Sequence, residues 1–305
     1  MHASGALPAD ARIPLSQPAV RWGTLEAEMT TDRDARADEL RHDTRVGDVE
    51  LTRWPTAVGR SAAGLFTGVG RRLGAHPALT LTLAIGAAAV FLLTFLVARV
   101  YDAVTDRDGV AALDRPLLDA AIALRSPPLD GFAAGVAYLF GPVGMPAMAV
   151  LAIVLLAAVR RSWTPVILVA SAGIGSLLMT IAGKDVVQRH RPEFVDAIPP
   201  FESSPSFPSG HTLNATVIAG VVGYLIWLRR RTIAAKVAAI VVPLVIAIAV
   251  GLTRVLLGAH WFTDVLAGWL LGATWLAVIV TAHRLYLTAR SRGAPALPPT
   301  ARAAR

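Results

Sequence analysis

Six long apolar segments constrain the fold of this chain more than any other feature of its sequence. Hydrophobic residues make up 54% of the 305 residues, and each segment is close to the roughly 20 residues that a helix needs to cross a bilayer. The sequence therefore predicts an all-α, polytopic membrane protein with six transmembrane helices. We place these helices at residues 78–101, 142–159, 163–183, 211–228, 235–257 and 262–284.

The first two predicted spans differ from the others. The span 78–101 is too long and too far from Met1 to be a cleaved secretory signal, so we interpret it as a signal anchor. The span 142–159 is short, and residues 129–140 before it either form an interfacial helix or extend it. The predicted membrane domain as a whole covers residues 78–284.

Arginines gather on one side of this domain, which predicts its orientation. The positive-inside rule assigns their side to the cytoplasm, so we expect a multi-pass protein of the plasma membrane with both termini cytoplasmic. The cytoplasmic positions are Arg71, Arg72, Arg160, Arg161, Arg229, Arg230, Arg231, Lys236, Arg284, Arg290 and Arg292. The opposite, extracytoplasmic segments 102–141, 184–210 and 258–261 contain many acidic residues instead.

The two ends of the chain lack long apolar runs. Residues 1–75 mix acids and arginines with few aromatics, which predicts a largely disordered cytoplasmic tail. A short amphipathic helix at 24–41 is the alternative for part of this tail. Residues 290–305 contain three prolines, and we expect a second disordered cytoplasmic tail there.

Charge and cysteine content exclude several classes of function. The net charge is +8, but no basic run alternates with aromatic residues, so we expect no nucleic-acid binding. In a membrane protein such an excess is typical of cytoplasmic loops that contact anionic lipids. The chain has no cysteine, and therefore no disulfide, thiolate nucleophile or cysteine-based metal site.

A first polar patch, Lys184 with Arg191-Pro192, ends the third span. Lys184 and Arg191 are seven residues apart, which is two helical turns, so they share a face if the helix continues that far. Pro192 then disfavours further helix and turns the chain outward. A single cation at a helix end usually complements the helix dipole or reaches the headgroups, so this patch has meaning only together with others.

A second patch, Pro208-Ser209-Gly210-His211, begins the fourth span. Ser209 is a favourable N-cap, Gly210 lets the backbone approach a ligand closely, and the free amides of a helix N-terminus bind anions. His211 projects from the first turn toward such an anion. The alternative is a capped helix with an interfacial histidine.

A third patch holds Arg254, His260 and Asp264, between the fifth and sixth spans. His260 and Asp264 have i,i+4 spacing, so they meet on one face. A carboxylate bonded to one imidazole nitrogen fixes the tautomer and leaves the other nitrogen as a nucleophile. Arg254, six residues before His260, can reach the same ligand across a tight turn.

Together the three patches meet the needs of phosphoryl transfer through a histidine. They supply cations for the phosphate, a nucleophile, a proton donor and an orienting carboxylate. Zinc is the rival ligand, but it requires three or four protein ligands. His190 lies inside the first patch, and the remaining histidines, His2, His42, His76 and His283, fall on the cytoplasmic side. We therefore predict no metal and no cofactor.

The order and spacing of the patches resemble the type 2 phosphatidic acid phosphatase (PAP2) superfamily. Its signature is Lys-x6-Arg-Pro, then Pro-Ser-Gly-His, then Ser-Arg-x5-His-x3-Asp. The first two motifs read here Lys184-DVVQRH-Arg191-Pro192 and Pro208 to His211, and the third reads Thr253-Arg254-VLLGA-His260-WFT-Asp264. Thr253 replaces the usual serine and keeps the hydroxyl. The resemblance covers roughly residues 78–284.

The resemblance implies six helices, an outward-facing site and a role for each motif residue. His260 would attack phosphorus to give a phosphohistidine, with Asp264 orienting it. His211 would protonate the leaving lipid oxygen and then activate water. The phosphate-binding residues would be Lys184, Arg191, Ser209, Gly210 and Arg254.

We therefore expect a membrane lipid phosphatase that acts on a lipid mono- or diphosphate. Undecaprenyl diphosphate, phosphatidate and phosphatidylglycerophosphate are the candidate substrates, and the outward site slightly favours recycling of a carrier lipid. The superfamily also includes soluble vanadium haloperoxidases, but six apolar spans argue against that function. A non-enzymatic lipid-phosphate transporter or scramblase is the alternative. Transporters tend to place ionisable residues near the bilayer midplane, whereas here they cluster at helix ends.

Overall fold

The computed structural model describes residues 43–46, 49–73, 77, 79–80, 82–88, 92 and 109–293. Within these ranges α-helices dominate, and two strands of two residues each form a small antiparallel hairpin. In chain order the elements are β1 (Arg45–Val46), β2 (Val49–Glu50), α2 (Ala57–Leu73), η1 (Gly109–Leu113), α4 (Asp114–Ala123), α5 (Pro127–Leu139), α6 (Gly144–Arg160), α7 (Thr164–Val187), η2 (Phe194–Asp196), α8 (Gly210–Arg229), α9 (Ile233–Leu256) and α10 (Phe262–Gly293).

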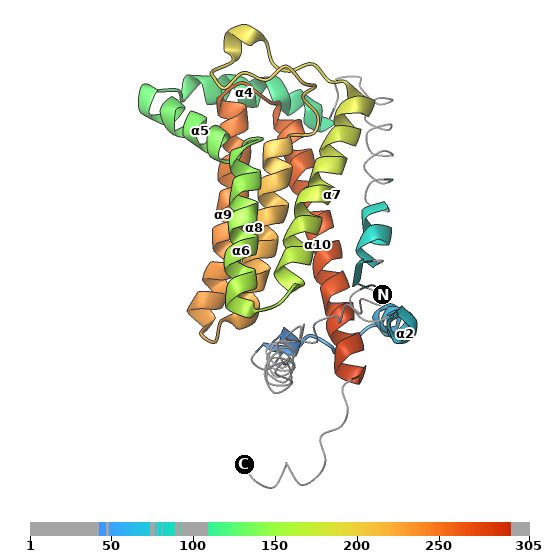
Figure 1. Ribbon diagram of the computed structural model, residues 1–305. Helices are drawn as coiled ribbons and strands as arrows, with labels where there is room; N and C mark the ends of the chain where they lie inside the picture. Colours follow the sequence, from blue (N-terminus) through green and yellow to red (C-terminus); the bar gives the residue numbers. More distant parts are fainter. Residues whose placement is uncertain are drawn as a thin grey trace, which may run out of the picture.

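Helices α6 to α10 run side by side as a bundle, and α4 and α5 lie across one end of it (Figure 1). In the described part of the chain, α7, α8, α9 and α10 are each long and apolar enough to cross a membrane. They confirm as helices the predicted spans from residue 163 onward. The first predicted span, 78–101, lies mostly outside the described residues.

The segment before the predicted span 142–159 forms a helix of its own. Helix α5 begins at Pro127 and ends at Leu139, and α6 then starts at Gly144 with a bend of 58° between the two axes. The turn is tight, because a Cβ on Gly144 would lie 2.2 Å from the Leu139 carbonyl oxygen. Counted together, α5 and α6 make a fifth candidate span.

Within residues 1–75, for which we expect a largely disordered tail, the described residues 43–46 and 49–73 include secondary structure. The hairpin and α2 lie within these ranges, and Phe66 of α2 is buried in the core. Trp54 donates a hydrogen bond from Nε1 to Thr288 Oγ1 of α10 at 3.1 Å. These are tertiary contacts with distant residues, which local periodicity does not reveal. Residues 1–42, including the alternative helix at 24–41, lie outside the described part.

The C-terminal helix is also longer than predicted. Helix α10 continues to Gly293, whereas we placed its end at 284 and expected a disordered tail from 290. The expectation is therefore wrong for residues 290–293, and residues 294–305 are outside the described part. Packing explains the extension, since Leu285, Tyr286 and Leu287 are all buried in the core.

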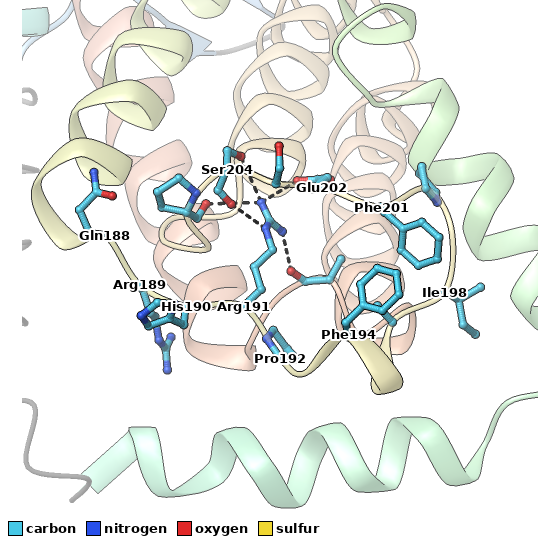
Figure 2. Close-up of a pocket in the computed structure, with 16 residues that line it drawn as sticks. Gln188, Arg189, His190, Arg191, Pro192, Phe194, Ile198, Phe201, Glu202 and Ser204 are labelled. Carbon is cyan, nitrogen blue, oxygen red and sulfur yellow. Dashed lines mark hydrogen bonds and ion pairs between the residues drawn. The ribbon is translucent and has the colours of Figure 1, made fainter.

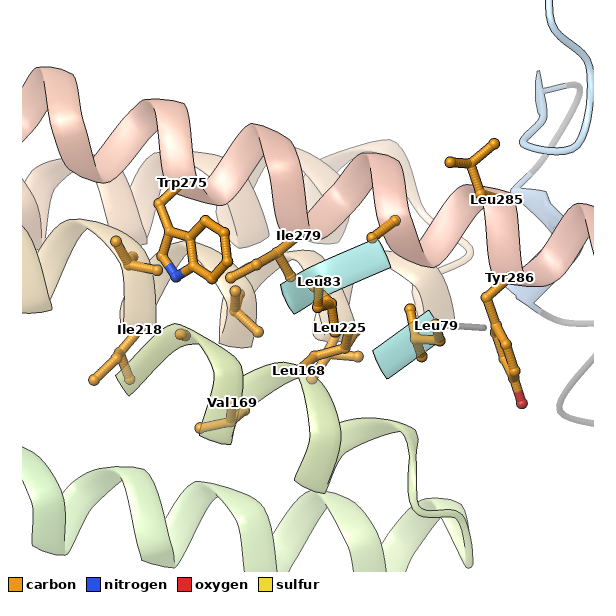
Figure 3. Close-up of a cluster of buried hydrophobic side chains, with 14 of the residues drawn as sticks. Leu79, Leu83, Leu168, Val169, Ile218, Leu225, Trp275, Ile279, Leu285 and Tyr286 are labelled. Atoms are coloured by element: carbon orange, nitrogen blue, oxygen red, sulfur yellow. The ribbon is translucent and has the colours of Figure 1, made fainter. Parts of the chain in front are cut away.

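The core lies where α7, α8 and α10 meet. Trp275 and Ile279 of α10 pack there with Leu168 of α7 and with Ile218 and Leu225 of α8 (Figure 3). Helix α9 shows the opposite pattern, since much of its apolar surface faces outward. Its exposed residues include Ile240, Val241, Val242, Leu244, Val245, Ile248 and Leu252. An exposed apolar surface of this kind suits contact with lipid rather than water.

Glycines bring the helix ends close together at one end of the bundle. A Cβ on Gly268 of α10 would lie 3.0 Å from the Ser209 carbonyl oxygen, so α10 can approach the start of α8 only because this residue is small. Gly258, in the loop between α9 and α10, has φ +64°, and a Cβ there would lie 2.2 Å from the Asp196 carbonyl oxygen. The loop after α7 therefore packs directly on the loop after α9.

Candidate active site

The three predicted patches lie at the same end of the bundle. The first follows the end of α7, the second begins α8, and the third spans the end of α9 and the start of α10. Figure 1 shows these helix ends beneath the loop from α7 to α8, next to α4 and α5. Residues separated by up to eighty positions are thus brought into one region.

The first patch is assembled differently from the prediction. Helix α7 ends at Val187, and Gln188 takes a left-handed conformation with φ 48°. Arg191 therefore lies beyond the helix, so the condition for a shared helical face with Lys184 is not met. The two cations meet instead on the loop, because both Lys184 Nζ and Arg191 Nη2 donate to Ser204 Oγ, at 2.9 and 3.3 Å.

A carboxylate that we did not predict stands at the centre of the site. Glu202 accepts hydrogen bonds from Arg191 Nη2, at 2.7 Å, and from Arg254 Nη2. Its oxygens also lie 3.6 Å from His211 Nδ1 and 3.8 Å from His260 Nε2. Two guanidinium groups and two imidazoles from different elements therefore converge on one anionic group.

Arg254 is the most deeply buried of these cations. It is fully buried at the end of α9, and Glu202 binds one of its three guanidinium nitrogens. Within the described part of the chain, its Nε and Nη1 have no hydrogen-bond partner. Buried N–H groups without an acceptor are costly, so the site has capacity for more acceptor oxygens than Glu202 provides.

The second patch places His211 against α5. Its Nε2 lies 3.2 Å from the Ala137 carbonyl oxygen, which can only accept, so Nε2 carries a hydrogen and Nδ1 faces Glu202. Ser209 occupies the predicted N-cap position, but its side chain makes no capping bond. Its Oγ accepts from Thr212 Oγ1 at 2.9 Å, and Gly210 lies tightly against Thr180 of α7.

The third patch has the predicted pairing of His260 with Asp264. His260 Nδ1 lies 3.5 Å from Asp264 Oδ2, longer than a standard hydrogen bond, and both side chains are fully buried. Because the carboxylate faces Nδ1, the other nitrogen, Nε2, is free to accept. It lies 3.2 Å from Arg191 Nη1 and points to the same side as Glu202.

Asp264 is held by a second group of residues that we did not predict. Its oxygens accept from Arg189 Nη1 at 2.6 Å, from the Trp261 amide at 2.9 Å and from Ser206 Oγ. Arg189 also donates to Asp114 Oδ2 of α4 at 2.6 Å. The Asp264 carboxylate is thereby fixed by donors from two loops, α7 to α8 and α9 to α10, and Arg189 links it to the helix that crosses the end of the bundle.

Burial and neighbouring charges set the ionisation of Glu202 and His260, which both lie in loops. Burial favours a raised pKa for Glu202, but Arg254, the two histidines and Arg191 outweigh it and lower the pKa to about 2. Burial lowers the pKa of His260 to about 4, although the adjacent Asp264 acts in the opposite direction. At neutral pH Glu202 is therefore an anion, and His260 is a neutral imidazole with a free lone pair.

A pocket opens beside this centre. It has a volume of about 500 Å³ and is lined almost entirely by the loop from α7 to α8 (Figure 2). Glu202 and Arg191 form part of its wall, and Phe194 and Phe201 lie close together in the apolar part, with ring centroids 4.7 Å apart. The pocket therefore combines an apolar surface with the charged centre.

In the ranges that the structure describes, no three His, Asp or Glu side chains form a group that could hold a metal ion. The polar groups at the centre are instead mostly hydrogen-bond donors. Donors of this kind suit an oxyanion such as a phosphoryl group.

Sequence reasoning missed Glu202, Arg189, Asp114 and Ser206. Arg189 lies inside the first motif and Glu202 is one of many acids on the predicted outer side, and neither has a predicted role. The motifs do not specify them, and their partners lie far away in the chain. The acidic residues of this loop, between patches that contain cations, are the one sequence signal that could have indicated an internal counter-charge.

Comparison with known proteins identifies the class of this one. The model of the PAP2 superfamily matches residues 164–286, which include all three patches. Phosphatidylglycerophosphatase B of Bacillus subtilis (strain 168) is 31% identical over 183 residues, which is 58% of this chain and 87% of that protein. The helical bundle and the match together define a membrane phosphatase. The chain belongs to the PAP2 superfamily.

One solved structure agrees with this assignment. The crystal structure of a transmembrane PAP2-type phosphatidylglycerolphosphate phosphatase from Bacillus subtilis matches with a TM-score of 0.55 and 28% identity, over 63% of this chain and 93% of that one. The crystal structure of Aquifex aeolicus LpxE is more distant, with a TM-score of 0.42 and 22% identity over 56% of this chain and 94% of its own.

Replacing Arg189 by alanine tests the second group of residues. The variant leaves two carboxylates, Asp114 and Asp264, buried with less compensation, so we expect a loss of about 3 kcal/mol or more in stability. Thermal unfolding of the purified protein in detergent measures this. Arg115→Ala is the matched control, because the Arg115 side chain is 53% exposed and ion pairs of exposed side chains contribute little to stability. Equal losses in the two variants would contradict the assignment.

Proposed function

We propose that the protein is an integral-membrane lipid phosphate phosphatase. It hydrolyses the terminal phosphate of a lipid mono- or diphosphate through a phosphohistidine intermediate. His260 is the nucleophile, Asp264 orients it, and His211 is the general acid and base. Lys184, Arg191, Ser209, Gly210 and Arg254 form the phosphate-binding region.

One observation carries this proposal above the others. Arg191, Arg254, His211 and His260 all face a single carboxylate, that of Glu202. A centre that holds one oxyanion between two guanidiniums and two imidazoles has the donors that a phosphoryl group needs. A nucleophile and an acid on opposite sides of that group are the further requirement for transfer.

In the first step, the phosphoryl group takes the position of the Glu202 carboxylate. The His260 Nε2 lone pair attacks phosphorus, forming the P–N bond while the bond from phosphorus to the leaving oxygen breaks. Asp264 stabilises the positive charge that develops on the imidazole. His211 enters this step as an imidazolium with hydrogens on both ring nitrogens. It donates the Nδ1 proton to the leaving oxygen and becomes neutral, and the two arginines neutralise the equatorial oxygens.

In the second step, water attacks the phosphohistidine. Neutral His211 accepts a proton from this water, the new P–O bond forms, and the P–N bond breaks. Inorganic phosphate leaves, and His260 returns to its neutral form. The Ala137 carbonyl keeps the hydrogen on His211 Nε2 in both steps, so Nδ1 alone exchanges the proton.

The pocket and the relatives support the proposed substrate class. The apolar wall of Phe194, Phe201 and Ile198 next to the charged centre suits an amphiphile whose phosphate is terminal. Undecaprenyl diphosphate, phosphatidate and phosphatidylglycerophosphate all meet this description. The name of the Bacillus subtilis relative supports phosphatidylglycerophosphate, and an outward site supports a carrier lipid. Membership in a phosphatase superfamily gives no support to the alternative of a transporter or scramblase.

Replacing His260 by alanine tests the covalent mechanism. Purified protein is assayed for phosphate release from a panel of lipid mono- and diphosphates, and we expect His260→Ala to lose activity by about three orders of magnitude or more, with expression and insertion intact. His190→Ala is the control, since the His190 side chain is exposed and only its backbone carbonyl is used, by Trp261. Near-normal turnover by His260→Ala would exclude the phosphohistidine.

We propose that the reaction needs no metal. The arginines and the imidazoles supply the charge and the proton transfer that a metal ion would otherwise supply. Activity on the best lipid substrate should therefore persist after extensive treatment with EDTA. The measurement is phosphate release before and after chelation. A loss that one particular divalent ion restores would contradict metal independence.

We also propose that the site faces away from the cytoplasm. The arginines at the other end of the bundle support this orientation through the positive-inside rule. The chain has no cysteine, so single cysteines report topology without a background. We expect an impermeant maleimide to label Val195→Cys, whose side chain is exposed near the pocket, in intact cells. Arg231→Cys, between α8 and α9, should react only after permeabilisation. The reverse labelling pattern would overturn the orientation.

A further inference from the structure

Glu202 holds the position that the phosphoryl group must take. One of its oxygens binds Arg254 and lies 3.6 Å from His211, and the other binds Arg191 and lies 3.8 Å from His260. The nucleophilic nitrogen of His260 therefore faces a carboxylate oxygen. A ligand that is to react with His260 must first displace this carboxylate from both guanidiniums.

The geometry allows such a displacement. The Glu202 side chain is 22% exposed, whereas those of Arg254 and Asp264 are fully buried. Glu202 also lines the pocket of about 500 Å³, so its side chain has space to move away from the guanidiniums. Its neighbours Ser204 and Pro205 are held separately by Lys184, so the loop need not unfold when the carboxylate leaves.

The free-energy cost of displacing the Glu202 carboxylate is the same for every ligand, but ligands differ in the new contacts that compensate this cost. A phosphate monoester carries a charge of about −1.5 to −2 at pH 7 and three terminal oxygens. It exceeds the single charge of Glu202, and its third oxygen can reach the Nε and Nη1 groups of Arg254, which Glu202 leaves without an acceptor. A phosphodiester has one charge and two terminal oxygens, so replacing Glu202 by a phosphodiester adds neither charge nor acceptor oxygens at the two arginines.

We propose that Glu202 is a specificity-determining residue, an internal competitor that admits terminal phosphates and excludes the phosphodiesters of ordinary membrane lipids. The inference rests on the proposed function, since it concerns the same centre. It has a clear use in a bilayer, where phosphodiester headgroups surround the site at high concentration. Without the carboxylate, these monoanions would occupy the two arginines.

Inhibition kinetics of the Glu202→Gln variant test this inference. The variant keeps the shape of the side chain and removes its charge. Phosphate release from the best substrate of the lipid panel is measured in micelles of an uncharged detergent, with increasing amounts of phosphatidylglycerol as a phosphodiester competitor. We expect weak inhibition of the natural protein and an inhibition constant lower by about tenfold or more in Glu202→Gln.

Glu193→Gln is the matched control. Glu193 lies in the same loop, but its side chain is exposed, so this variant removes one charge from the same surface without touching the centre. It should respond to phosphatidylglycerol as the natural protein does. An unchanged inhibition constant in Glu202→Gln, or an equal change in Glu193→Gln, would overturn the inference.

Thermal shifts provide a measurement that does not depend on turnover. Inorganic phosphate should raise the unfolding temperature of the natural protein, and dimethyl phosphate, a diester, should not at the same concentration. Both should raise it in Glu202→Gln, or in Glu202→Ala if the glutamine variant does not fold. Equal shifts by the two anions in the natural protein would overturn the inference. Failure to hydrolyse any lipid phosphate would instead overturn the proposed function and leave the shifts to be interpreted as anion selection.

Discussion

The burial of Arg254 is the constraint on which the rest of the site depends. A guanidinium with no exposed surface inside a helical bundle requires an anion at hydrogen-bond distance. Glu202 provides it, and it does so from a loop rather than from a neighbouring helix. The loop from α7 to α8 must therefore fold back over the end of α9, which brings Arg191 beside His260. One buried charge thus dictates the path of about twenty residues.

The two carboxylates of the site differ in how firmly they are held. Asp264 is fully buried and accepts from a guanidinium, a hydroxyl and a backbone amide, so it has little freedom to move. Glu202 is partly exposed, and within the described residues its hydrogen bonds come from two arginine side chains. Orientation of a nucleophile requires a fixed partner, whereas entry of a substrate requires a centre that can be vacated. The same functional group therefore serves both purposes through different surroundings.

Local patterns predicted what depends on nearby residues. The apolar runs from residue 163 onward are helices, and the spacing of His260 and Asp264 predicted their contact. The patterns could not predict the roles of Glu202 and Arg189. Glu202 is 52 residues from its partner Arg254 in the sequence, and Arg189 is 75 residues from its partner Asp264. The helix α2 was not predicted for the same reason, because its contacts with α10, rather than its own composition, stabilise it.

The opposite end of the bundle shows why an arginine–carboxylate pair alone does not make a site. Arg160 at the end of α6 binds Asp43 at 2.9 Å and donates to the Leu225 carbonyl oxygen of α8. Both side chains of this pair are almost fully buried, at 3% and 1% exposure, so nothing can exchange with Asp43 without separating the N-terminal segment from the bundle. Glu202, by contrast, borders a pocket. The chemistry of the two pairs is similar, but their accessibility differs. The Arg160–Asp43 pair only stabilises the fold, whereas the position of Glu202 can be taken by a phosphate.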